Sequence, residues 1–520
     1  MKQLREVTKK ALLVPLLLPT LALANKPATP ERPNIVLFMV DDMGWQDTSL
    51  PFWDKKTYLN EQFHTPNMEK LAEQGVMFTQ AYACAICSPT RVSLMTGMNA
   101  ARHRVTNWTL YKDKMNTNTV KGLKIPKWNY NGIAISEDLN NAVYTPQPLP
   151  KLLKDNGYYT IHCGKAHFGA VGTPTENPQN VGFDVNIAGF AGGGPASYLG
   201  KENFAKVNNP NSIWNIPGLE EFNGQDIFLT EALTQKALKV VHDSVPKNKP
   251  FFLYMSHYAV HAPITGDDRY EEKYIQRGLS PIEAKYASMV EGMDKSLGDI
   301  MKYLKRHKLD KNTIVIFMSD NGGLSAHARG GLANTHNLPL SSGKGSIHEG
   351  GIREPMIVKW PGVTTPNTKC NQSVIIEDFY PTILEMANIS YKENKKQPID
   401  GLSFVSELEG KKSKNKDRAF YWHFPNSWGP QGPGISFYSA IREGDWKLIY
   451  YHTDQRFELF NITNDIGEHY NLASQQPKRT KKMATKLTKY LKEVDAQMPT
   501  FAKDGSPVPY PSEIETIIER

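Results

Sequence analysis

The chain has 520 residues, of which 40% are hydrophobic and 22% charged, and its formal net charge is +8 at pH 7. This composition is typical of globular proteins and provides enough apolar material for a large core. The positive charge is mild and dispersed, so it is compatible with an anionic substrate. We expect no nucleic-acid partner, because nucleic-acid binding needs clustered basic residues. Four cysteines in so long a chain also exclude a disulfide scaffold.

The N-terminus has the pattern of a signal peptide. Four basic residues precede an apolar run at 11–23, which ends in the small-x-small sequence Ala-Leu-Ala. The run has about 13 residues and two prolines, short of the roughly 20 apolar residues that a membrane-spanning helix needs, and no later stretch is long enough. We therefore expect residues 1–24 to be a signal peptide, no stable membrane insertion, and a periplasmic or secreted mature protein.

Two predicted strands end in acidic turns. NIVLFMV is a continuous apolar run, typical of a buried parallel strand, and Asp41 and Asp42 follow it directly. TIVIFM is a second such run, followed after one serine by Asp320 and Asn321. Both runs place acidic groups at the carboxyl end of a core strand, which is the edge of an open α/β sheet where ligands bind.

Between these two strands, helical and strand-like segments alternate. TPNMEKLAEQG, QPLPKLLKDNG and the long run AKYASMVEGMDKSLGDIMKYLKRHK have apolar residues at helical spacing. YYTIHCG and PFFLYMSHYA are typical of strands. The alternation predicts a doubly wound α/β fold, and we expect the α/β class with a large mixed, mostly parallel sheet sandwiched by helices.

The pattern changes after the predicted helix EDFYPTILEMAN. Charged segments precede FYSAIREGDWKLIYYH and RFELFNIT, whose alternating polarity is typical of an antiparallel sheet. We expect a main domain over residues 25–410 and a smaller C-terminal α+β subdomain, carrying an antiparallel sheet, over residues 411–520.

The two acidic turns predict a metal site. Asp41, Asp42, Asp320 and Asn321 offer only oxygen donors, and carboxylates gathered at one sheet edge need a cation. Hard oxygen ligands favour Ca²⁺, or Mg²⁺, over zinc. Either acidic pair alone could instead cap a following helix. The same arrangement at the ends of two strands favours the metal.

The segment ACAICSPTRVSLMTG holds two of the four cysteines. A C-x-x-C pair can indicate a redox or zinc site, but no second pair at metal spacing accompanies this one. Cys87 begins the sequence C-S-P-T-R, and L-M-T-G follows it. This resembles the sulfatase signature C-x-P-x-R with its downstream L-x-T-G, in which the cysteine is oxidised after translation to Cα-formylglycine. Cys84 and Cys163 are better explained as small buried hydrophobic residues.

Further motifs of the same family follow in order along the chain. They are D-D-M-G at 41–44, G-K-A-H at 164–167, H-A-P at 261–263, S-D-N-G at 319–322, G-K-G at 343–345 and E-G-G-I-R-E-P at 349–355. Each motif alone is a weak signal, but their ordered occurrence around C-x-P-x-R is specific. The chain thus resembles the type I, formylglycine-dependent sulfatases of the alkaline phosphatase superfamily, whose fold matches the class predicted above.

The resemblance implies roles for individual residues. The implied metal ligands are Asp41, Asp42, Cys87, Asp320 and Asn321. The implied catalytic residues are Cys87, Arg91, Lys165, His167, His261 and Lys344, and of these Lys165, His261 and Lys344 also bind substrate. The chemistry fits these residue types, because an S–O bond breaks only when negative charge is neutralised on the sulfate and on the leaving oxygen.

The resemblance also implies a mechanism. The aldehyde at position 87 hydrates to a gem-diol, and one hydroxyl attacks sulfur while Asp320 takes or orients its proton. His261 protonates the leaving oxygen, helped by Lys344. His167 then removes a proton from the second hydroxyl, which expels sulfate and regenerates the aldehyde. Two histidines suit acid and base work near neutral pH. We assign catalysis to His261 rather than His257, because His261 has the proline two positions on.

Substrate identity depends on less specific signals. Aromatic and polar stretches around Trp108, Trp128 and Trp428 suit carbohydrate rings, and His423 in the last of these stretches is a candidate substrate contact, although tryptophan is more often ordinary core packing. We expect hydrolysis of O-sulfate groups on a sulfated polysaccharide or its oligosaccharides. A formylglycine-generating enzyme is the expected partner during maturation.

Two other functional classes stay open at this point. A phosphodiesterase or phosphonate monoester hydrolase of the same superfamily would reuse the formylglycine and the metal site. A non-catalytic glycan-binding homologue would keep the fold and leave Cys87 unmodified.

Overall fold

The computed structural model describes residues 32–117, 122–246, 249–413, 415, 417–429 and 431–515. The predicted signal peptide, residues 1–24, lies outside this range. The described residues belong to one compact unit that begins at Arg32. Within them, no helix has the length and apolar character needed to cross a membrane.

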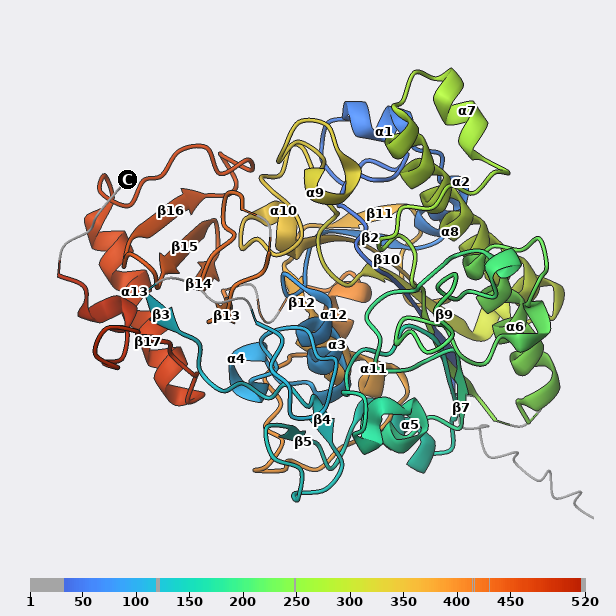
Figure 1. Cartoon of the computed structure of the whole chain (residues 1–520), viewed down its shortest axis with the longest axis horizontal. Helices are drawn as coiled ribbons and strands as arrows, with labels where there is room; N and C mark the ends of the chain where they lie inside the picture. The colour runs from blue at the N-terminus through green and yellow to red at the C-terminus, as the bar shows by residue number, and fades with distance from the viewer. Residues whose placement is uncertain are drawn as a thin grey trace, which may run out of the picture. The chain divides into compact units, whose positions relative to one another are not determined.

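A nine-stranded sheet forms the centre of the fold (Figure 1). Its strands are β1 (Asn34–Val40), β2 (Val76–Tyr82), β6 (Tyr159–Gly164), β7 (Val185–Ile187), β8 (Phe251–Ser256), β9 (Thr313–Ser319), β10 (Arg353–Lys359), β11 (Thr368–Cys370) and β12 (Val374–Ile375). The order is β11-β2-β10-β9-β1-β8-β6-β7, with β12 also pairing with β2. β1 lies in the middle, parallel to β8 and β9, and only β10 runs antiparallel to its neighbours. The predicted mixed, mostly parallel sheet is confirmed.

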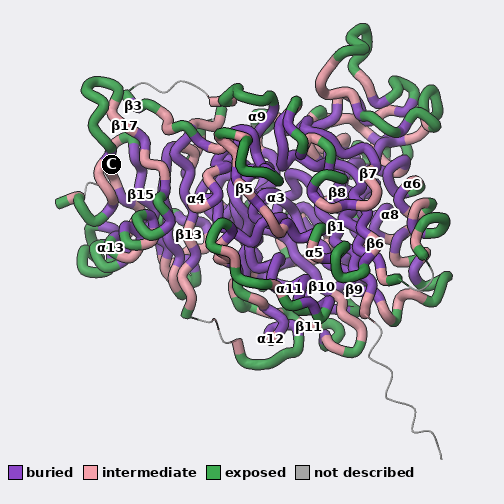
Figure 2. Tube along the Cα trace, turned by 90° about the horizontal axis from the view of Figure 1, so that it is seen from below, coloured by how far each residue is buried: buried purple, intermediate pink, exposed green. Residues whose placement is uncertain are grey.

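Helices cover both faces of this sheet, because β1 is apolar on both sides. Ile35, Leu37 and Met39 pack into a core that includes residues of α3 (Cys87–Thr96), α5 (Leu149–Asp155) and α11 (Phe379–Met386). The alternate residues of β1 pack into a second core that includes residues of α2 (Pro66–Glu73), α6 (Leu229–Ser244) and α8 (Pro281–Arg306). Figure 2 shows the result as a continuous buried interior around the sheet strands.

The helix boundaries follow local sequence signals. α2, α5 and α8 each carry proline in the first turn, where its missing N–H costs nothing. The side chain of Ser280 caps α8 by accepting from the backbone N–H of Glu283. The shorter elements are α1 (Tyr58–Gln62), α4 (Ala100–His103), β3 (Leu123–Lys124), β4 (Ile133–Ala134), β5 (Val143–Tyr144), α7 (Glu271–Gln276), α9 (Ala326–Arg329), α10 (Glu349–Ile352), α12 (Val405–Leu408) and β17 (Thr500–Phe501).

The C-terminal part carries the predicted antiparallel sheet. Its strands are β13 (Ala419–Phe424), β14 (Tyr438–Glu443), β15 (Trp446–Tyr451) and β16 (Phe457–Asn461), and α13 (Pro477–Glu493) packs against it (Figure 1). The sheet is joined to the rest of the unit by buried polar contacts. Trp422 Nε1 donates to the Ala83 carbonyl at 2.9 Å, and the buried ammonium of Lys447 lies 2.9 Å from a carboxylate oxygen of Glu349. The proposed domain boundary at residue 410 stays a prediction.

Candidate active site

One edge of the sheet gathers most of the predicted site residues. The strands β1, β2, β6, β8 and β9 all point their carboxyl ends to this edge, since β2 and β9 are both antiparallel to β10. The residues that follow these strands are Asp41 and Asp42 after β1, Cys87 after β2, Lys165 and His167 after β6, His261 after β8, and Asp320 and Asn321 after β9. Parallel pairing of β1 with β9 aligns Val40 with Ser319, which places the two acidic turns side by side.

The glycine of the G-K-x-H motif has a packing role. Gly164 has a φ of +97°, and a Cβ atom there would lie 1.9 Å from the carbonyl oxygen of Ser256 on the neighbouring strand. Only glycine fits so close to a backbone. The next amide, that of Lys165, donates to the same Ser256 carbonyl at 2.7 Å. Gly164 therefore fixes where the chain turns toward the site.

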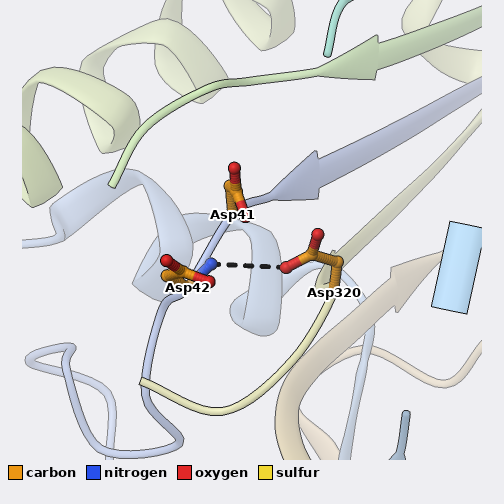
Figure 3. Close-up of side chains that lie close together, drawn as sticks. All are labelled: Asp41, Asp42 and Asp320. Carbon is orange, nitrogen blue, oxygen red and sulfur yellow. Dashed lines mark hydrogen bonds between the residues drawn. The ribbon is translucent and has the colours of Figure 1, made fainter. Parts of the chain in front are cut away.

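Three buried carboxylates form a candidate metal centre (Figure 3). One oxygen from each of Asp41, Asp42 and Asp320 can be chosen so that all three lie within 4.8 Å of one another. The backbone N–H of Asp42 donates to Oδ1 of Asp320 at 3.3 Å. Asp41 Oδ1 and Asn321 Oδ1 are buried acceptors without a hydrogen-bond partner among the described residues. An all-oxygen donor set with unpartnered acceptors fits a hard divalent cation such as Ca²⁺ or Mg²⁺.

Each carboxylate of this cluster is paired with one buried cation. Lys165 Nζ lies 2.6 Å from Oδ2 of Asp41. Arg91 Nη2 lies 2.7 Å from Oδ2 of Asp320. Lys344 Nζ lies 2.6 Å from Oδ1 of Asp42. The three pairs balance in charge, so a bound divalent cation would leave the site with net positive charge, which suits an anionic substrate.

The pKa values of the two adjacent aspartates, Asp41 and Asp42, shift in opposite directions. Burial, and then the charge of Asp320, raise the pKa of Asp41 well above its usual value. Burial alone would also raise the pKa of Asp42, but Lys344 and then His261 outweigh burial and lower it. Like charges in a buried cluster resist simultaneous ionisation, and a cation removes that penalty. The electrostatics of the protein atoms therefore favour metal binding.

Cys87 occupies the N-terminus of α3 and is almost fully buried. No side chain caps this helix end, so its first amides are left for a ligand or for residue 87 itself. Burial raises the pKa of the Cys87 thiol, while Lys165 and Lys344 act in the opposite direction. Cys84 and Cys163 are buried, as predicted for hydrophobic bystanders.

Arg91 contacts this site from the protein interior. Its side chain is completely buried, and besides Asp320 it donates to the Lys165 carbonyl at 2.9 Å and to Ser256 Oγ at 2.5 Å. Through these contacts Arg91 holds Asp320 and the turn at Lys165 in place.

The two predicted catalytic histidines use different ring nitrogens to donate to a backbone carbonyl. His167 donates from Nε2 to the Thr109 carbonyl at 3.0 Å, so its buried Nδ1, which has no partner among the described residues, is free to accept a proton. His261 donates from Nδ1 to the Ala262 carbonyl at 2.7 Å, and its Nε2 faces Oδ2 of Asp42 at 3.7 Å. Burial and then Lys344 lower the pKa of His261 to about 3. Burial and then Lys165 lower that of His167.

His257 is structural, as the sequence suggested. The ring is completely buried, Nε2 pairs with Ser296 Oγ at 2.9 Å, and the ring packs on Phe38 with centroids 4.9 Å apart. His261 keeps a side-chain exposure of 25%, so of these two imidazoles it is the one that solvent reaches.

The glycine run A-G-G-G-P at 191–195 contacts both histidines that were predicted to be catalytic, and the sequence analysis did not identify it. A Cβ atom on Gly193 would lie 2.4 Å from Cε1 of His167, and one on Gly194 would lie 2.8 Å from Nδ1 of His261. The backbone of this loop therefore packs directly on both imidazoles. Three consecutive glycines were the available signal, because such a run indicates close approach of the backbone to another group.

His423, the predicted substrate contact in the C-terminal part, is held by hydrogen bonds within the protein. His423 is buried on β13, its Nδ1 bonds Ser439 Oγ at 2.8 Å, and its Nε2 donates to the Gln497 carbonyl at 3.0 Å. Both nitrogens are therefore satisfied inside the protein. The sequence could not reveal this, because one partner lies on the neighbouring strand and the other lies far along the chain.

Comparisons with known proteins agree with this geometry. Residues 33–389 match the sulfatase family, and residues 343–497 match the family described as N-sulphoglucosamine sulphohydrolase, C-terminal. A sulfatase of Formosa agariphila is 31% identical, with 98% of each chain covered. Human N-acetylgalactosamine-6-sulfatase is 30% identical over 85% of this chain and 82% of its own. The crystal structure of Ps i-CgsB superposes with a TM-score of 0.69 at 28% identity, covering 88% of this chain and 93% of that one.

The fold and the buried cluster of carboxylates and cations define a hydrolase for anionic esters. The family match spans most of the described residues and includes every strand end that carries the site. The chain belongs to the sulfatase family, and it is a sulfatase that hydrolyses sulfate esters.

Proposed function

We propose that this sulfatase removes O-sulfate groups from a sulfated polysaccharide or its oligosaccharides. The observation that carries the proposal is the buried cluster of three carboxylates paired with three cations, several of whose charges act on Cys87. The relatives support a glycan substrate. The human relative is named N-acetylgalactosamine-6-sulfatase, and a second structure of Ps i-CgsB, 27% identical to this chain, is a complex with k-i-k-neocarrahexaose.

A divalent cation, Ca²⁺ or alternatively Mg²⁺, would be held by Asp41, Asp42, Asp320 and Asn321, with residue 87 as a further ligand, and it would neutralise charge on a sulfate oxygen. Cys87, once oxidised to formylglycine by a formylglycine-generating enzyme, would supply a hydrated aldehyde as the nucleophile. The amides at the start of α3 and the ammonium groups of Lys165 and Lys344 would stabilise the negative charge around the sulfate.

Proton transfer is assigned to the two histidines. His167 offers the unpartnered Nδ1 as the base that takes the proton of the second hydroxyl and releases sulfate. His261 points Nε2 toward the site and would give its proton to the leaving sugar oxygen. The pKa of His261 is low without substrate, and a bound sulfate ester beside Nε2 raises it, because a nearby negative charge favours the imidazolium.

The experiment uses protein expressed with a formylglycine-generating enzyme and purified with Ca²⁺. Sulfate release is measured on a panel of sulfated galactan, fucan and glycosaminoglycan oligosaccharides, with an aryl sulfate, an aryl phosphate and an aryl phosphonate in parallel. We expect sulfate release from at least one oligosaccharide. Dominant turnover of the phosphate or phosphonate would overturn the proposal.

Maturation is tested separately by mass spectrometry. The Cys87 peptide from the native host should show the mass of the aldehyde, and the mature N-terminus should begin after Ala24 if the protein is exported as we propose. A thiol at position 87 in the native host would contradict the nucleophile. An uncleaved N-terminus would contradict the proposed periplasmic or secreted location.

A further inference from the structure

A cavity of about 500 Å³ is lined in part by Trp428, whose ring lies close to Lys344 of the candidate site. Its lining residues are Trp108, Met115, Asn116, Thr117, His327, Ser427, Trp428 and Gly429. The volume is in the range of pockets that enclose small ligands, about 300–1,000 Å³. None of these eight lining residues, all of them described, carries a carboxylate, so the cavity does not repel an anionic sugar.

One wall of the cavity is connected to the nucleophile and to the base. Trp108 directly precedes Thr109, whose backbone N–H is bonded to Ser88 Oγ at 3.2 Å and whose carbonyl accepts from His167 at 3.0 Å. Ser88 is the residue after Cys87. A ligand that packs on the indole of Trp108 therefore lies next to Thr109, which contacts both Ser88 and His167.

Another lining residue, Trp428, lies close to Lys344, the proposed substrate-binding cation. The Nζ atom of Lys344 lies 5.7 Å from the ring centroid of Trp428. Gly345, with a φ of +88°, lets this ring approach, since a Cβ atom there would lie 2.1 Å from the indole. His327 packs edge-on against Trp428, with ring centroids 5.6 Å apart. Lys344 thus lies between the buried Asp42 and the cavity.

The His327 segment is anchored rather than loose. Arg329, two residues further along α9, is completely buried, pairs with Asp47 at 3.1 Å and with Glu283 at 2.7 Å, and lies over the ring of Tyr286. Asp47 in turn accepts from the amide of Gly44, in the loop after the metal aspartates. The wall is therefore built before any ligand binds, which reduces the entropy that binding must overcome.

We propose that this cavity is the subsite for the sugar ring that carries the scissile sulfate, with Trp108 and Trp428 as its stacking walls and His327 and Asn116 as its polar contacts. Aromatic faces pack on the C–H faces of sugar rings, while polar groups at their edges bond hydroxyls. Both tryptophans are only partly buried, and the side-chain nitrogen of Asn116 has no hydrogen-bond partner among the described residues. By contrast, Trp128 and Trp422 are buried in the core.

This inference rests on the proposed function, because it specifies where the sugar of that substrate binds. It also gives the cavity a role in selection. Some sugars cannot stack on the two tryptophans, and others have no hydroxyl within reach of His327 and Asn116. Such a sugar would bind with its sulfate away from residue 87. Specificity for the sugar is then decided by residues outside the sulfatase motifs.

The test compares Trp108→Ala, His327→Ala and the wild type on two substrates, the oligosaccharide that the wild type hydrolyses best and an aryl sulfate. We expect kcat/KM for the oligosaccharide to fall roughly tenfold or more relative to kcat/KM for the aryl sulfate, mainly through KM. Trp108→Phe keeps an aromatic face and should recover most of this loss. Tyr470→Ala removes an aromatic ring that is 73% exposed elsewhere on the surface and serves as the matched control.

A second readout does not depend on turnover. Titration calorimetry with the desulfated form of the same oligosaccharide should show weaker binding to Trp108→Ala and to His327→Ala than to the wild type. Equal losses on both substrates with unchanged sugar binding would overturn the subsite, as would no loss on either. His327 is exposed, so its variant tests the proposal if Trp108→Ala does not fold. Failure of the proposed function is distinct, because the wild type would then release no sulfate from any oligosaccharide.

Discussion

Lys344 Nζ lies 2.6 Å from Oδ1 of Asp42, and both side chains are buried. The same carboxylate also accepts from Asn321 Nδ2 at 2.8 Å. Asn321, a proposed metal ligand, and Lys344, a proposed substrate-binding cation, therefore both contact the carboxylate of Asp42. Loss of either partner would leave the other charge buried and unpaired, which is costly in a protein interior.

Substitution of Lys344 should affect both activity and stability. We expect Lys344→Ala to lower the free energy of unfolding by about 3–5 kcal/mol, because Asp42 would lose its buried partner, and to abolish most sulfate release. Added Ca²⁺ should recover part of the stability, since the cation would then compensate Asp42, but it should not recover activity. Urea unfolding and sulfate release with and without Ca²⁺ measure these effects. Unchanged kinetics in the variant would show that Lys344 does not bind substrate.

Metal removal gives a second prediction. Chelation should abolish turnover and lower the melting temperature, and Ca²⁺ at about 100 times its Kd should restore about 2.7 kcal/mol of stability. Asp320→Asn should abolish the Ca²⁺-dependent rise in melting temperature, because Asp320 is one of the three clustered carboxylates. Differential scanning calorimetry with Ca²⁺, Mg²⁺ and chelator makes the comparison. A full Ca²⁺ response in Asp320→Asn would refute the assigned metal centre.

The glycine loop gives a third prediction. Gly193 and Gly194 do not lie in the left-handed region, so alanine is acceptable to the backbone and only the new methyl group matters. Gly193→Ala should displace His167 and lower kcat by roughly 10–100-fold, the range expected for a misplaced base. Gly194→Ala should displace His261 and harm poor leaving groups, such as sugars, more than activated aryl sulfates. Equal kinetics for the variants and the wild type would show that the loop yields without disturbing the rings.

Buried neutral histidines predict loss of stability in acid. Burial lowers the pKa of His103, His162 and His257 to about 3, from the usual 6.5. Between these two values the unfolded chain binds more protons, so the stability from each neutral ring is complete above pH 6.5 and is lost as the pH falls toward 3. Each ring contributes a slope of about 1.4 kcal/mol per pH unit within that window.

His257→Asn isolates one of these contributions. The variant should be less stable at neutral pH, but its free energy of unfolding should fall less steeply between pH 6 and pH 4, by about 1.4 kcal/mol per unit. Denaturant unfolding across this range provides the slopes. His469→Asn, at a side chain that is 68% exposed, is the control and should leave the slope unchanged. Parallel slopes for His257→Asn and the wild type would contradict the assignment.

Much of the sheet and the metal centre could be predicted because their signals are local. β1 and β9 are unbroken apolar runs, and such runs are buried on both faces wherever they occur. The acidic residues that follow them must then lie at the carboxyl edge of a parallel sheet. The β14–β15 hairpin was predictable for a similar reason, since its alternation and its Gly444 turn are contiguous.

The sequence by itself determined the chemistry of this protein, namely the family motifs, their order, and which residues follow each strand. These features are local, and each depends on residue type at a particular position in the chain. Only the tertiary structure decided which cation pairs with which carboxylate, that His423 is enclosed between Ser439 and Gln497, and that Trp108 and Trp428 face one cavity. These relationships join segments far apart in the chain, so they depend on how the strands and loops pack and not on any pattern within one segment.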